Sequence, residues 1–85
     1  MQDPIDPPTA QATLDVRGFN CPLPVLKTKL ALRPMAEGEV LRVLATDPMS
    51  VVDLRAYCAR TGHELLRWSG DAEFEFLIRK GGAPG

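Results

Sequence analysis

The sequence of 85 residues has few of the residues that build disulfide scaffolds or metal sites. It contains two cysteines, Cys21 and Cys58, and one histidine, His63, too few for a disulfide framework or a tetrahedral zinc site. No run of about 18 apolar residues is present, and the N-terminus lacks the pattern of a secretory signal. We therefore expect a cytoplasmic protein with free thiols, no structural metal and no membrane span.

An excess of charge of one sign is also lacking. Ten Lys and Arg stand against eleven Asp and Glu, a net charge of −1. Binding to nucleic acid or to an anionic membrane favours a strongly basic patch, so neither partner is expected. The length suffices for one small core and excludes a cofactor domain joined to a substrate domain.

The chain is predicted to hold one folded body between two short ends. Residues 1–11 contain three of the eight prolines and one large aliphatic residue, Ile5, which predicts a flexible lead. Residues 81–85, Gly-Gly-Ala-Pro-Gly, predict a flexible tail. We expect one domain over residues 12–80, without internal repeats.

The first half of this domain predicts a strand and a helix. Residues 13–17 alternate polar and apolar side chains, and Gly18 ends the strand. Residues 25–33 have helical character, and the preceding prolines can occupy a first turn, where amide hydrogens have no helical partner. Pro34 disfavours helical geometry just before it, so the helix should end near Arg33.

Three leucines of this helix suggest which face is buried. Leu23, Leu26 and Leu30 are spaced as on one side of a helix, so we expect that side to face the core.

The second half predicts a strand, a helix and a hairpin. The helix is expected to be capped by Thr46 or Asp47, to bury Val51, Leu54 and Cys58, and to end at Gly62. Phe74, Phe76 and Ile78 should point to one face of the last strand. These elements are predicted over residues 39–45, 46–62, 64–69 and 73–79. The order β-α-β-α-β-β indicates an α/β (α+β) two-layer sandwich, with both helices on one face of a four-stranded sheet.

Cys21 lies between the first predicted strand and helix. Free backbone N–H groups and the positive end of the helix dipole stabilise an anion there, so we expect a lowered thiol pKa. Pro22 and Pro24 would hold the turn rigid, and Lys27 or Lys29 would add positive potential. A lone cysteine is more often a small buried hydrophobic residue, but a position at a strand-to-helix junction beside these prolines favours an exposed nucleophile.

The other polar candidates have structural interpretations. Cys58 lies on the apolar face of the second helix and indicates core packing, with a resolving thiol as the alternative. His63 follows the helix stop at Gly62, where a cationic imidazole would be favoured by the dipole. Asp47 and Asp53 are better explained as a helix cap and a solvated helix face than as an acid–base pair.

The segment of residues 14–27, LDVRGFNCPLPVLK, resembles the signature of the TusA/SirA sulfur carrier family, in which a strand and a glycine precede Cys-Pro-x-Pro at a helix start. Further resemblances follow in the family's order at residues 38–39, 45–48, 58, 61–66 and 78–80. The resemblance spans about residues 13 to 80, which is essentially the whole predicted domain.

The resemblance implies a mixed sheet in the order 1-2-4-3 with the last strand antiparallel to the others. It implies that Cys21 accepts sulfane sulfur as a persulfide, with Gly18, Pro22, Pro24 and Lys27 supporting the motif. A donor of the cysteine desulfurase or rhodanese type would load this sulfurtransferase, and an acceptor protein or cofactor pathway would receive the sulfur. No metal or organic cofactor is required, and a monomer is expected.

Two other classes of function stay open. The chain could be a non-catalytic interaction or regulatory module of the same fold, in which Cys21 only shapes the helix start. It could also be a thiocarboxylate carrier that ends in Gly81-Gly82, which would require removal of the three residues that follow.

Overall fold

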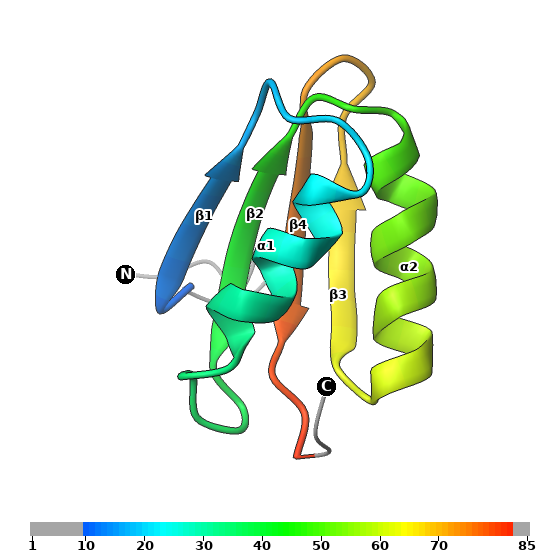
Figure 1. Cartoon of the computed structure of the whole chain (residues 1–85). Helices are drawn as coiled ribbons and strands as arrows, with labels where there is room; N and C mark the ends of the chain where they lie inside the picture. Colours follow the sequence, from blue (N-terminus) through cyan, green and yellow to red (C-terminus); the bar gives the residue numbers. More distant parts are fainter. Residues whose placement is uncertain (1–9, 83–85) are drawn as a thin grey trace.

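Residues 10–82 are described by the computed structural model of the chain (Figure 1). The elements are β1 (Ala12–Val16), α1 (Leu23–Leu32), β2 (Val40–Ala45), α2 (Met49–Thr61), β3 (Glu64–Ser69) and β4 (Phe74–Arg79). Their order is the predicted β-α-β-α-β-β. Most of the predicted lead and tail lies outside the described residues, so the boundaries at 12 and 80 stay predictions. In the described range, no helix has the length and apolar character needed to cross a bilayer.

The sheet has the strand order β1-β2-β4-β3. β1 is parallel to β2, with Val16 opposite Ala45. β4 runs antiparallel between β2 and β3, and its Phe76 lies opposite Val43 on one side and Trp68 on the other. The predicted fold class and the strand order implied by the family resemblance are both confirmed.

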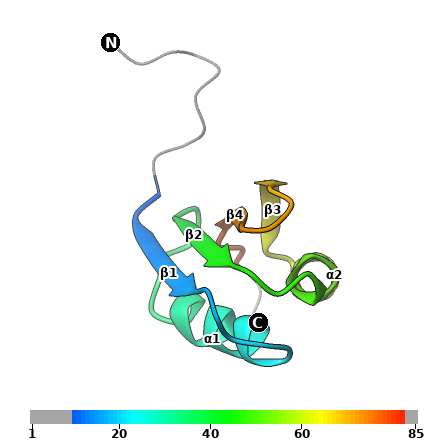
Figure 2. The same ribbon diagram turned by 90° about the horizontal axis from the view of Figure 1, so that it is seen from above.

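Both helices cover the same face of the sheet (Figure 2). A buried cluster fills the space between the two layers and includes alternate residues of β2 and β4, as expected for a sheet with one covered face. Its members are Val16, Leu32, Leu41, Val43, Ala45, Leu54, Tyr57, Cys58, Phe74, Phe76 and Ile78. The predicted inward positions on β4 are therefore confirmed, as are Leu54 and Cys58 on α2, whereas Val51 is only partly buried and packs against the cluster.

The buried face of α1 is not the predicted one. Leu23, Leu26 and Leu30 are exposed, and the prediction that they face the core is wrong. The buried residues of α1 are Pro24, Thr28 and Leu32. The hydroxyl of Thr28 donates a hydrogen bond to the carbonyl of Pro24 at 2.8 Å, which satisfies this buried polar group.

The second helix, α2, begins later than predicted and ends where predicted. Pro48 occupies its N-cap position, so the prediction of Thr46 or Asp47 as the cap residue is wrong. Asp47 lies just before the helix and accepts a hydrogen bond from the N–H of the first helical residue, Met49, at 3.1 Å. Gly62 ends the helix with φ of 84°, and its N–H donates to the carbonyl of Cys58.

Lys80 and Gly81, near the end of the described chain, contact the segments at the C-terminal ends of both helices. His63 is buried, and its Nδ1 accepts a hydrogen bond from the N–H of Gly81 at 3.0 Å. Burial and the charge of Lys80 lower the pKa of His63, so the expectation that the helix end favours a cationic imidazole is wrong. The ammonium of Lys80 donates to the carbonyls of Leu32 and Met35 at 2.6 and 3.0 Å, which closes the C-terminal end of α1.

Replacing His63 should remove one pH dependence of stability. Because the pKa of His63 is lowered in the folded protein, the unfolded chain takes up this proton first as the pH falls. The free energy of unfolding should therefore decrease from about pH 8 to about pH 5. In His63→Asn an amide oxygen can accept from Gly81 and does not titrate, so the decrease should be smaller. Urea denaturation at each pH measures both curves.

A cavity variant serves as the control for this prediction. Val43→Ala removes buried methyl groups, so it should lower stability without changing how stability depends on pH. Equal pH dependence in wild type and His63→Asn would contradict the role assigned to the imidazole.

Removing the Tyr57 hydroxyl should stabilise the fold. This hydroxyl is buried and has no hydrogen-bond partner among the residues that the structure describes. An unsatisfied buried polar group costs about 1–3 kcal/mol, so Tyr57→Phe should raise the free energy of unfolding by about 1 kcal/mol. The ring contact with His63, 5.7 Å between centroids, would be retained. A loss of stability in urea denaturation would show that the hydroxyl has a partner.

Candidate functional site

Two loops meet at the carboxyl ends of β1 and β2. Residues 17–22 join β1 to α1, and residues 46–48 join β2 to α2. Because the two strands are parallel, both loops leave the sheet at the same edge (Figure 1). This edge is where open α/β sheets commonly build ligand and catalytic sites.

Side chains of the second loop hold the backbone of the first. Thr46 Oγ1 accepts a hydrogen bond from the N–H of Gly18 at 2.9 Å, and Asp47 Oδ2 accepts one from the N–H of Cys21 at 2.6 Å. The other oxygen of Asp47 binds the N–H of Met49 at the start of α2. Gly18 has φ of 86°, a left-handed conformation that favours glycine. Cys21 is thus held through its amide by a carboxylate from a distant part of the chain.

Cys21 is exposed, as predicted for a presented thiol. It precedes Pro22, the N-cap residue of α1, and Pro24 lies buried in the first turn. Neither proline has an N–H group, and the N–H of Leu23 donates to the carbonyl of Asn20 at 2.9 Å. Few amides of the first turn are therefore left to stabilise a thiolate, which weakens the expected effect of the helix start.

The pKa of Cys21 is raised, so the predicted lowering is wrong. The largest cause is a hydrogen bond between the thiol and the Asp53 carboxylate, followed by partial desolvation and by the negative charges of Asp53 and Asp47. A carboxylate beside a thiol disfavours the thiolate, because two like charges would then be adjacent. Cys21 is consequently held as a thiol in the free protein.

Asp53 is the site residue that the sequence interpretation missed. Its carboxylate is half-buried and faces Cys21 rather than lying on a solvated helix face. No sequence pattern marks it, because its proximity to Cys21 depends on how helix α2 and the loop before α1 meet in space.

The predicted contribution of the lysines to the thiol is not found. The ammonium of Lys27 lies 5.0 Å from the centroid of the Phe19 ring, in a cation–π contact. Neither Lys27 nor Lys29 is among the groups that shift the pKa of Cys21.

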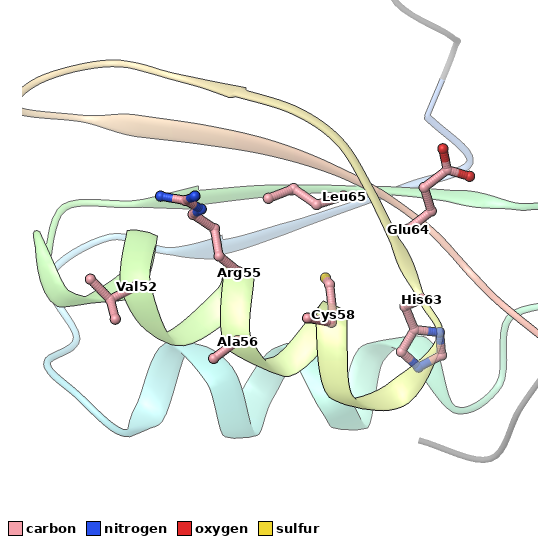
Figure 3. A pocket seen from close by; sticks show the side chains of 8 residues that line it. Val52, Arg55, Ala56, Cys58, His63, Glu64 and Leu65 are labelled. Carbon is pink, nitrogen blue, oxygen red and sulfur yellow. The ribbon is translucent and has the colours of Figure 1, made fainter.

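The second thiol, Cys58, lies in the core. Burial raises its pKa to about 11, which confirms the interpretation as core packing. A groove of about 610 Å³ runs between α2 and β3 beside it (Figure 3). Its lining residues are Val52, Arg55, Ala56, Cys58, Ala59, His63, Glu64 and Leu65. Cys21 and its two carboxylates are not among them, so the groove is separate from the candidate site.

The reactive group that the site offers is the sulfur of Cys21. Within residues 10–82, no three His, Cys, Asp or Glu side chains are grouped so that they could hold a metal ion. The arrangement is suited to thiol chemistry in which two carboxylates control the proton on the sulfur.

Comparisons with known proteins place this chain in a family. A family model described as sulfurtransferase TusA matches residues 12–80. The sulfur carrier protein TusA of Allochromatium vinosum is 48% identical over 68 residues, which cover 79% of this chain and 90% of the relative. The sulfur carrier protein TusA of Pseudomonas putida strain GB-1 is 44% identical over 73 residues, which cover 85% of this chain and 91% of the relative.

A solved structure agrees with these sequence matches. The crystal structure of a SirA-like protein from Desulfitobacterium hafniense has a TM-score of 0.71 and 29% identity, and the match covers 82% of this chain and 97% of that one. The matched family range contains every strand and helix of the fold as well as Cys21, Asp47 and Asp53. This chain therefore belongs to the TusA sulfurtransferase family.

Proposed function

We propose that this protein carries sulfane sulfur as a persulfide on Cys21 and relays it between proteins. The observation that carries the proposal is the contrast between the two thiols: Cys21 is exposed at a tethered loop, whereas Cys58 is buried with a pKa of about 11. Attack on a sulfur atom requires an accessible thiol that can ionise, which only Cys21 offers. The relatives named sulfur carrier protein support the same function.

Loading is a thiol exchange that needs no external oxidant. The Cys21 sulfur attacks the outer sulfur of a donor persulfide, and a new S–S bond forms while the donor S–S bond breaks. The inner donor sulfur leaves as a thiolate and takes up the proton that Cys21 loses. Release repeats these steps with an acceptor thiol attacking the outer sulfur of the Cys21 persulfide.

Asp53 and Asp47 influence when this sulfur exchange takes place. Their charges disfavour the Cys21 thiolate while the protein is free, which protects an exposed sulfur from oxidation. A partner cation placed against Asp53 would neutralise the carboxylate and favour the thiolate in the complex.

The partners follow from this chemistry. A sulfur relay requires one protein that donates sulfur and one that accepts it, and we propose a cysteine desulfurase or a rhodanese as the donor. A monomer presents Cys21 to each partner in turn. A relay through free thiols requires a reducing compartment, so a cytoplasmic location is part of the proposal.

The alternative is a non-catalytic interaction module of the same fold. The raised pKa of Cys21 is the observation that favours it, because a module has no need of an activated thiol. Sulfur loading distinguishes the two functions directly.

Sulfur uptake should depend on Cys21 and not on Cys58. Incubation with cysteine and a cysteine desulfurase, or with thiosulfate and a rhodanese, should add the mass of one sulfur atom that a reductant removes. Cys21→Ser should lose this uptake because the nucleophile is gone, and Cys58→Ser should retain it because the replaced thiol is buried. Intact-mass spectrometry measures the product. Uptake that persists in Cys21→Ser and disappears in Cys58→Ser would show that Cys58 carries the sulfur, and would overturn the proposal.

Neutralising Asp53 should make Cys21 more reactive. Asp53→Asn removes the carboxylate charge beside the thiol, so the pKa of Cys21 should fall and its alkylation near pH 7 should become several-fold faster. The measurement is the rate of iodoacetamide labelling of the Cys21 peptide as a function of pH.

A distant acidic residue provides the control for this experiment. Glu37 is exposed in the loop between α1 and β2, at the opposite end of β2 from Asp47. Glu37→Gln should leave the labelling profile unchanged. If Asp53→Asn shifts the profile no more than Glu37→Gln does, the control of the thiol by Asp53 is refuted.

A further inference from the structure

The sheet has an open edge at β3. Among the described residues, β3 is hydrogen-bonded to β4 on one side and to no strand on the other. No backbone group of residues 64–69 takes part in the hydrogen bonds that the described chain makes outside its helices and strands. An edge strand presents a row of unpaired N–H and C=O groups, so β3 offers donors and acceptors to another extended segment.

The groove between α2 and β3 lies along this open edge, because β3 is the outermost strand and α2 packs next to it (Figure 1). Its volume of about 610 Å³ is within the usual range of ligand-binding pockets. The small side chains of Ala56 and Ala59 are exposed in it, and Val52 and Leu65 add apolar surface. The groove can therefore receive apolar side chains beside a free strand edge.

The groove contains one uncompensated charge. Glu64 forms an ion pair with Arg79, whereas Arg55 forms none with another residue that the structure describes. Arg55 is exposed, and Figure 3 shows the side chain of Leu65 directed from β3 toward it. A guanidinium group binds a carboxylate through paired hydrogen bonds, so the charge of the groove favours an anionic group.

We infer that the groove between α2 and β3 binds an extended segment of another protein, which pairs with the edge of β3, places apolar side chains in the groove and places a carboxylate on Arg55. Strand addition is a recurrent mode of peptide recognition, in which main-chain hydrogen bonds provide affinity and alternate side chains fill pockets. Because α2 and β3 are joined by a tight turn and run in opposite directions, a segment with its C-terminal carboxylate at Arg55 would run parallel to β3.

This attachment site is separate from the sulfur chemistry. Neither Cys21 nor Asp53 lines the groove. A bound segment would therefore leave the thiol accessible, and it would keep a partner attached while Cys21 exchanges sulfur. The inference adds to the proposed function and can be tested without it.

Other occupants fit the groove less well. The pairing of β3 with β4 shifts register between Leu65 and Arg67, and such a bulge opposes continuous edge-to-edge pairing with a second copy. Two copies paired through β3 would also bring together two unpaired Arg55 side chains, whose like charges repel. A small amphipathic anion would use Arg55 and the apolar lining but would leave the strand edge unpaired.

The test uses a peptide as long as β3, which has six residues. The peptide is acetyl-Lys-Val-Thr-Val-Thr-Val with a free C-terminal carboxylate, so its valines lie on one face of the extended chain. In a titration followed by ¹H–¹⁵N NMR, it should shift the amide signals of β3 and α2 and saturate. The same peptide with a C-terminal amide should bind about fivefold or more weakly, because it lacks the charge that Arg55 recognises.

Backbone methylation tests the pairing itself. Successive residues of a strand direct their N–H groups to opposite sides, so only one alternate set can bond to β3. One peptide is N-methylated at its threonines and another at its valines. Strand addition predicts that one of the two loses binding and that the other retains it. Equal binding by both would overturn strand addition and assign the groove to a small anion.

Arg55 and Arg60 form a matched pair for the charge. Both are exposed on α2 and neither has an ion pair with a described residue, but only Arg55 lines the groove. In Arg55→Gln the acid and the amide peptide should bind equally, whereas Arg60→Gln should keep the preference for the acid. Ala59→Leu should weaken both peptides about fivefold or more, because the larger side chain fills the groove. Circular dichroism checks that each variant is folded.

The outcomes separate this inference from the carrier function. No shift of the β3 and α2 signals at about 1 mM peptide would overturn the inference, and sulfur uptake at Cys21 in the same preparation would still support the carrier. Binding of the peptide by a protein that takes up no sulfur would refute the carrier and support the attachment site. A dimer in light scattering that Ala59→Leu abolishes would assign the groove to a second copy and overturn the inference.

Discussion

The carboxylate of Asp47 determines the geometry of the functional end of this protein. It accepts hydrogen bonds from the amide of Cys21 and from the amide of Met49, so one side chain joins the loop before α1 to the start of α2. The parallel pairing of β1 and β2 makes this possible, because it brings both loops to the same edge of the sheet. Thr46 adds a second attachment at Gly18. The position of the reactive sulfur therefore depends on a contact between segments far apart in the chain.

Helix α1 is apolar on both sides, which is why its leucines need not be buried. The side that packs on the core carries Leu32 with Val25 and Ala31. Thr28 can face the core because its hydroxyl is satisfied within the helix. The outward leucines provide apolar surface next to the thiol.

The charges around Cys21 disfavour its thiolate, so the site does not activate the sulfur in the free protein. A helix start usually stabilises a thiolate, but here two prolines remove amide donors and Asp53 binds the thiol. An exposed cysteine that stays protonated resists oxidation, which suits a carrier that waits for its partner. The proposed activation then belongs to the complex, because only a partner can bring a positive charge to Asp53.

The sequence by itself determined the elements, the fold class and the candidate thiol. Strand alternation, the prolines around Cys21 and the stop at Gly62 are local signals, since neighbouring residues create them. The tertiary structure alone decided the buried face of α1, the burial of His63 against Gly81 and the placement of Asp53 beside Cys21. Each of these depends on segments that meet only when the chain is folded, and a pKa depends on whichever charges surround the group in space. Local patterns therefore identified the reactive residue, and folding decided the environment that controls it.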